Sequence, residues 1–142
     1  MPKIDFNDAK GVVSSAGSGW LRNGVEISAS AGQLDKYTLT GKITGLNTGD
    51  EHVYVPVPAT GTLVAAFSSV SGDPGAPTLI RIHNAAGSSL GNITIADEAV
   101  AGDVDMLLNV SSAVTAGTYL RAISNNGASN AVDAYITFII ER

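Results

Sequence analysis

The chain has 142 residues and a formal net charge of −5, and its length is that of one domain with one substantial core. It contains no cysteine, which excludes disulfides and cysteine-ligated zinc. Charged residues make up only 15% of the chain, against about 25% in an average soluble protein, which favours a protein that works packed in an assembly. The sequence contains no basic patch and no long apolar run, so nucleic acid and membranes are poor partners.

Residues 1–35 are predicted to form an N-terminal arm. Two stretches of small polar residues, Ser14–Gly19 and Ser28–Gly32, flank the only tryptophan. Asn23-Gly24 is a strong tight-turn signal, so the arm should contain a short strand or hairpin. Two interpretations stay open, because the arm could pack on its own subunit or reach a neighbour.

Residues 36–142 are predicted to form one all-β domain. Apolar and polar residues alternate in short runs, and turn residues separate these runs at the spacing of a sandwich or barrel. We expect an antiparallel, jelly-roll-like β-sandwich of about eight strands. Pro56 and Pro58 lack an amide donor, so their strand should lie at a sheet edge or end there. The expected strands are Tyr37–Thr44, His52–Val57, Thr62–Val70, Thr78–His83, Ile93–Ala96, Val104–Asn109, Thr118–Ser124 and Val132–Ile140.

The last strand shows the clearest period of two. Its apolar positions, from Val132 to Ile140, should face the core, and the alternate positions, including Tyr135 and Ile139, should face solvent or a partner. A strand this apolar would promote aggregation at an open edge, so we expect a partner on both sides. The predicted core consists of Leu63, Ile80, Ile82, Ile93, Ile95, Leu120, Ala122, Ile136, Phe138 and Ile140.

The sequence offers little for catalysis. His52 begins a strand and His83 faces outward beside Arg81, and neither has metal-ligand spacing, so both should be surface histidines. Asp103 and Asp105 could form a calcium site or an acid–base pair, but a polar outer face is the favoured interpretation. No nucleophile motif, phosphate loop or dinucleotide motif occurs. We therefore predict no enzyme activity, no catalytic residues, no cofactor and no metal site.

Exposed aromatic residues would be needed for sugar binding, which β-sandwiches often perform. The candidates are not clustered in the sequence, although Tyr119 and Tyr135 would be outward neighbours if the last two strands paired. A glycan-binding or receptor-binding module is accordingly the alternative function, with Trp20 and Tyr54 as its first candidates. The aromatic residues considered are Trp20, Tyr37, Tyr54, Tyr119 and Tyr135.

Several turn-and-strand motifs resemble those of small head proteins of tailed bacteriophages. In that family a Pro-x-x-Gly-Thr-hydrophobic strand opens a β-sandwich, an Ala-Gly-Asp turn follows, and a Val-Thr-Phe-x-Ile-x-Arg strand ends the chain. The matching stretches lie within residues 54–142. They are Tyr54-Val-Pro-Val-Pro-Ala-Thr-Gly-Thr-Leu63, Ile93-Thr-Ile95, Ala101-Gly-Asp-Val-Asp105, Val114-Thr-Ala-Gly-Thr118, Ser124-Asn-Asn-Gly127 and Ile136-Thr-Phe-Ile-Ile-Glu-Arg142.

The resemblance implies a capsid decoration, or cement, protein. Such a protein is a structural component of the virion that binds the outside of the assembled capsid and stabilises it, without catalysis. Its partners would be the major capsid protein of a phage head and copies of itself, most simply as a homotrimer. Together with the exposed positions of the last strand, the arm would supply the contacts, and the expected interface residues are Ile4, Phe6, Trp20, Leu21, Tyr135 and Ile139.

Overall fold

The computed structural model describes residues 6–7, 11–12, 20–22, 25–27, 36–48 and 51–142, and the chain divides into two units, Met1–Asp35 and Lys36–Arg142. In the first unit β1 (Phe6–Asn7) pairs antiparallel with β2 (Gly11–Val12), and β3 (Trp20–Arg22) pairs with β4 (Val25–Ile27). Arg22 is the register partner of Val25, so β3 and β4 form a hairpin. Its expected turn, Asn23-Gly24, lies outside the described residues.

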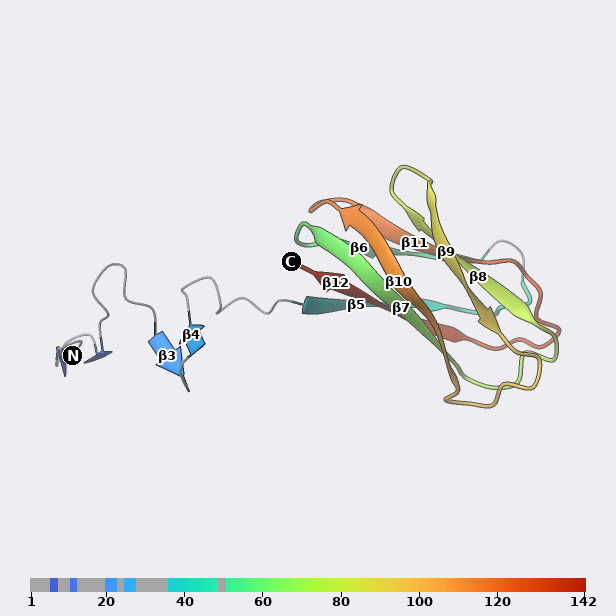
Figure 1. Cartoon of the computed structure of the whole chain (residues 1–142). Coiled ribbons are helices and arrows are strands. Elements are labelled where there is room, and N and C mark those ends of the chain that lie inside the picture. The colour runs from blue at the N-terminus through green and yellow to red at the C-terminus, as the bar shows by residue number, and fades with distance from the viewer. Residues whose placement is uncertain (1–5, 8–10, 13–19, 23–24, 28–35, 49–50) are drawn as a thin grey trace. The chain divides into compact units, whose positions relative to one another are not determined.

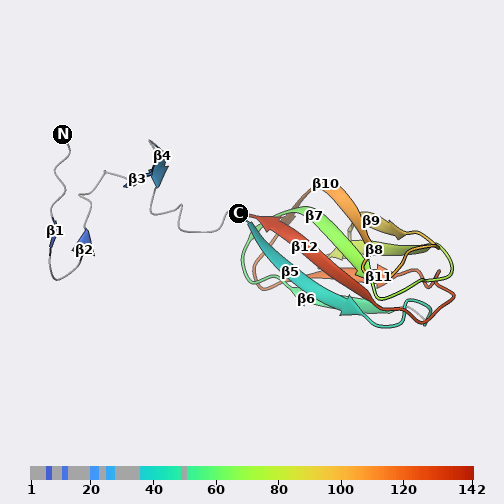
Figure 2. The same cartoon turned by 90° about the horizontal axis from the view of Figure 1, so that it is seen from below.

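The second unit is a sandwich of two four-stranded antiparallel sheets, as predicted. Figures 1 and 2 show the two layers face to face, one with the order β10-β7-β12-β5 and the other with the order β6-β11-β8-β9. This is the strand order of a jelly roll, in which most connections pass from one sheet to the other. The strands are β5 (Lys36–Ile43), β6 (His52–Pro56), β7 (Gly61–Val70), β8 (Thr78–Asn84), β9 (Ser89–Ile95), β10 (Val104–Val114), β11 (Tyr119–Ser124) and β12 (Ala134–Glu141).

The terminal strand β12 has the predicted place inside a sheet. It pairs with β5 on one side and with β7 on the other, so its backbone groups are satisfied in both directions. The strand that contains Pro56, β6, lies at a sheet edge as predicted, because proline cannot donate to a second neighbour. In the described part of the chain no helix is long and apolar enough to cross a membrane.

β9 and β10 extend well beyond their predicted bounds, because in each of them the pairing continues past a local shift in register. β9 begins at Ser89 instead of Ile93, since Gly91 has a φ of 140° and the register shifts there without ending the pairing. β10 runs on to Val114 through a bulge at Asn109, whose φ is 59°. Asparagine is one of the few residues other than glycine that adopt this left-handed conformation readily.

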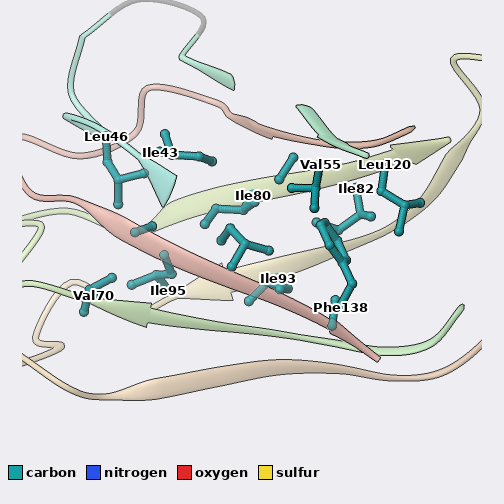
Figure 3. Close-up of a cluster of buried hydrophobic side chains, with 14 of the residues drawn as sticks. Ile43, Leu46, Val55, Val70, Ile80, Ile82, Ile93, Ile95, Leu120 and Phe138 are labelled. Atoms are coloured by element: carbon teal, nitrogen blue, oxygen red, sulfur yellow. The ribbon is translucent and has the colours of Figure 1, made fainter. Parts of the chain in front are cut away.

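The core lies between the two sheets, and every predicted core residue is buried. All ten have a relative exposure of 0%. Figure 3 shows side chains of the two sheets meeting, with Ile80, Ile82 and Leu120 from one sheet and Phe138 from the other. The core also contains four residues outside the predicted set, namely Ile43, Leu46, Val55 and Val57. The alternation along each strand decides this burial, because successive side chains point to opposite faces.

Candidate functional site

The outer face of the sheet β10-β7-β12-β5 exposes large apolar side chains. Val104, Met106, Leu108 and Tyr135 each have a relative exposure between 49% and 55%. The register aligns them with neighbours on β7 and β12, since Leu108 pairs with Ala65, which pairs with Ile139, and Met106 pairs with Phe67. We call this surface the apolar face, and its residues are Ala65, Phe67, Val104, Met106, Leu108, Tyr135 and Ile139.

The prediction that Asp103 and Asp105 belong to a polar outer face is wrong, because apolar side chains occupy that face. Asp103 precedes β10, and its carboxylate accepts a hydrogen bond of 2.9 Å from the amide of Val100. Asp105 lies on the opposite side of β10 from Val104 and Met106, opposite the buried Ser68. The two carboxylates therefore do not share a strand face, because the strand begins only after Asp103 and its outward positions are apolar.

Asp105 is a partly buried carboxylate at the edge of the sandwich. Burial, and secondly the nearby charge of Asp103, raise the pKa of the Asp105 carboxyl above its ordinary value. The two aspartates and Glu98 line a hollow of about 260 Å³. Among the described residues no group of three histidine, cysteine, aspartate or glutamate side chains is arranged to hold a metal ion.

We expect Asp105→Asn to stabilise the protein at pH 7 by at most about 0.5 kcal/mol, because solvent screens the charge of a carboxyl that is only partly buried. A carboxyl whose pKa is raised by folding binds its proton more tightly in the folded state, so its contribution to the free energy of unfolding falls as the pH rises through that pKa. The gain should therefore disappear near pH 3, where the carboxyl is protonated in both states. Urea unfolding at the two pH values measures this difference, and an equal gain at both would contradict the assignment.

An ion pair joins β5 to the segment before β12 beside the apolar face. Lys42 Nζ lies 2.7 Å from Asp133 Oδ2, and the amide of Gly45 donates a hydrogen bond of 3.1 Å to Asp133 Oδ1. The hydrogen bonds from Lys42 and from Gly45 lower the pKa of Asp133, and the Asp133 carboxylate raises the pKa of Lys42. The ammonium also lies 5.6 Å from the centre of the Tyr135 ring. The positive charge of Lys42 is thus neutralised locally.

The outer face of the other sheet, β6-β11-β8-β9, has a different character. The rings of Tyr54 and Tyr119 meet edge to face at 4.9 Å and 88°, and the His52 ring meets Tyr54 in the same way at 5.0 Å and 85°. The guanidinium of Arg121 lies 6.0 Å from the Tyr54 ring centre. We call this surface the aromatic–basic face, and its residues are His52, Tyr54, Arg81, His83, Tyr119 and Arg121.

This cluster was not visible in the sequence. His52, Tyr54, His83 and Tyr119 come from three strands that are far apart along the chain, and only the pairing of β11 with both β6 and β8 joins them. The pairing of β11 with β8 also brings Arg81 and Arg121 onto one face, although they are isolated from each other in the sequence. The suggestion that Tyr119 and Tyr135 are neighbours is wrong, since β11 and β12 belong to different sheets.

The predicted interface residues fall into two groups. Tyr135 and Ile139 lie on the outer side of β12, within the apolar face, as the alternation indicated. Phe6, Trp20 and Leu21 lie in β1 and β3, where the structure describes the backbone only, and Ile4 lies outside the described residues. Val104, Met106 and Leu108 were not among the predicted interface residues, although their alternation with Asp105 and Leu107 indicates a common strand face.

Comparison with known proteins identifies a shared fold. No protein-family model and no curated protein sequence matches the chain. A chain of the acid-stable capsid of Helicobacter pylori bacteriophage KHP30 matches with a TM-score of 0.52 and 16% identity, over 75% of this chain and 87% of that chain.

Two further structures match at lower scores. A chain of the cyanophage Pam1 capsid gives a TM-score of 0.45 and 15% identity over 99% of both chains. The module CsCBM6-3 from Clostridium stercorarium, solved with cellobiose, gives 0.47 and 9% identity over 68% of this chain and 70% of that one. Of the three similarities, the one to the KHP30 capsid chain is high enough to show a common fold.

Proposed function

We propose that the chain is a non-catalytic structural protein of a phage virion, which binds the outside of the assembled capsid and stabilises it. Its partners are the major capsid protein and further copies of itself, most simply as a homotrimer. The observation that carries this proposal is the apolar face. Large contiguous apolar surfaces are rare on monomeric proteins and mark sites of contact with other proteins.

Three further points support the proposal. The motifs in residues 54–142 resemble those of small phage head proteins, and a chain from a phage capsid structure has the same fold. The low content of charge, 15%, leaves little repulsion between closely packed copies. A protein that binds the assembled shell but not free subunits stabilises the shell by mass action, which requires contact area and not a reactive pocket.

We assign different contacts to the two units. The apolar face, with Tyr135 and Ile139, packs against a neighbouring copy in the trimer. Residues 1–35, with Ile4, Phe6, Trp20 and Leu21, attach the protein to the shell. Several copies joined in this way would bind the shell with greater avidity than one copy could.

The proposal predicts that Met106→Lys weakens self-association at least tenfold. Met106 lies in the apolar face opposite Phe67, so the new ammonium group would lose its water when a second copy packs there, without gaining a partner. Analytical ultracentrifugation across a range of concentrations measures the dissociation constant. Sedimentation with empty shells of the parent phage measures attachment, which should weaken together with self-association.

Thr94→Lys is the matched control, because it adds the same charge at an exposed position of β9 on the other sheet. This variant should associate like the parent. A parent protein that stays monomeric at millimolar concentration, or a Met106→Lys variant that associates as well as the parent, would refute the role of the apolar face. Failure of the parent to sediment with shells would refute the decoration function itself.

A further inference from the structure

The aromatic–basic face concentrates positive charge on a protein that is negative overall. Arg81, Arg121 and both histidines face outward from β6, β8 and β11, whereas the outward positions of these strands and of β9 carry no aspartate or glutamate. Within the described residues neither arginine forms an ion pair with a carboxylate; the Nε atom of Arg121 is buried, so a ligand would meet the terminal nitrogens of its guanidinium. Arg81 and Arg121 therefore place two guanidinium charges on one face of a chain whose net charge is −5.

The register places Arg121 at the centre of this face. On one side it pairs with Tyr54 of β6, and on the other with His83 of β8. The Arg121 guanidinium is half-buried and lies over the Tyr54 ring, so its orientation is restricted. A planar guanidinium fixed in this way is suited to a carboxylate, which it binds through two parallel hydrogen bonds.

The tyrosine rings supply a second kind of contact. Tyr54 and Tyr119 are 48% and 38% exposed and stand at right angles, so they form a corner with accessible ring surface. The electron-rich face of an aromatic ring attracts partly positive hydrogens, such as the C–H groups on one side of a sugar ring. Tyr119 also borders a hollow of about 180 Å³ lined by Asn84, Thr115 and Thr118, whose polar groups can meet sugar hydroxyls.

Other anionic partners fit this face less well. A single-stranded nucleic acid would use the same stacking, but its affinity depends on many phosphate contacts, and this face has two arginines on an acidic protein. An acidic peptide would match the charge but would gain little from the tyrosine corner. Charge and aromatic surface together fit a small ligand that has both a carboxylate and an apolar ring face.

From this arrangement we propose that the aromatic–basic face binds carboxylated saccharides, with Arg121 holding the carboxylate and Tyr54 and Tyr119 packing against the sugar ring. Arg81 and His83 border the carboxylate position. The site lies on the opposite sheet from the apolar face, so this binding does not depend on the proposed assembly role. A virion protein with such a site would hold the particle to acidic polysaccharides of a cell surface.

The test measures binding of two acidic sugars and their uncharged counterparts by isothermal titration calorimetry. Trigalacturonate is compared with its methyl ester, and 3′-sialyllactose with its methyl ester, so that each pair differs only in the charge of the acidic group. We expect at least one acid to bind at least tenfold more tightly than its counterpart. Arg121→Gln should remove this preference, and Tyr54→Ala should weaken binding of the acid at least tenfold.

Two conservative variants separate binding from folding. Tyr54→Phe keeps the ring and should bind like the parent, whereas Arg121→Lys keeps the charge without the planar fork and should recover only part of the affinity. Lys42→Gln is the matched control, because it removes a cation beside a tyrosine on the other sheet, and it should bind like the parent. Thermal unfolding followed by circular dichroism checks that each variant is folded.

Several results would overturn the proposal. These are the absence of binding at millimolar sugar, equal binding of acids and their uncharged counterparts, or binding that Tyr54→Ala leaves unchanged. Tighter binding of hexathymidylate or of hexaglutamate than of both acidic sugars would assign the face to nucleic acid or to acidic peptides instead. Because the measurement uses the free protein, its outcome is independent of whether the protein sediments with phage shells.

Discussion

Replacing Phe138 with alanine should destabilise the sandwich by about 3–5 kcal/mol, the usual cost of removing a buried phenylalanine ring. Phe138 is fully buried at the centre of β12, where it pairs with Leu39 of β5 and Ala66 of β7. Figure 3 shows its ring among the side chains of the opposite sheet, so its loss leaves a cavity between the layers. Because small domains are stable by only about 5–15 kcal/mol, urea unfolding should show a large loss of stability.

Tyr135→Ala is the control for this prediction. It removes an aromatic ring from the same strand, but from the exposed side, where 49% of the residue is accessible. The free energy of unfolding should change by less than about 1 kcal/mol. Similar losses for the two variants would mean that β12 does not separate a core side from a surface side.

The second large effect is expected for Gly61→Ala, which should destabilise the domain by about 1–3 kcal/mol. A Cβ atom at Gly61 would lie 2.5 Å from the carbonyl oxygen of Glu141 and 2.7 Å from Cγ2 of Ile140. The first of these atoms belongs to the backbone of β12, so the contact can be relieved only by moving the terminal strand. This crowding explains physically why glycine occupies the Gly-Thr position that opens β7.

Gly72→Ala provides the comparison for Gly61. There a Cβ would lie 3.5 Å from Val132 Cγ1, an ordinary van der Waals contact. We expect the stability to stay within about 0.5 kcal/mol of the parent, or to rise slightly because alanine restricts the unfolded chain. Thermal and urea unfolding of both variants measure the difference, and a Gly61→Ala protein as stable as the parent would show that β7 and β12 are not in close contact there.

The two outer faces illustrate which parts of a candidate site can be predicted. Tyr135 and Ile139 were assigned correctly to an outward face, since the period of two along a single strand suffices for that. Val104, Met106 and Leu108 were not predicted as outward residues, because Asp103 and Asp105 alternate with them and polar residues are normally expected on the outer side of a strand. The aromatic–basic face could not be predicted, because Tyr54, His83 and Arg121 come together only through the pairing of three strands.

The sequence by itself determined the fold class, the ten core residues and the position of β12 inside a sheet. The alternation of apolar and polar residues and the turn residues between the strands indicate the fold class and the core. The apolar character of β12 indicates its place inside a sheet, because an apolar strand at an open edge promotes aggregation. Only the tertiary structure decided which strands are neighbours, and therefore that one outer face is apolar and the other aromatic and basic. In a jelly roll consecutive strands mostly pass to opposite sheets, so residues that are close in sequence are separated and residues that are distant are joined.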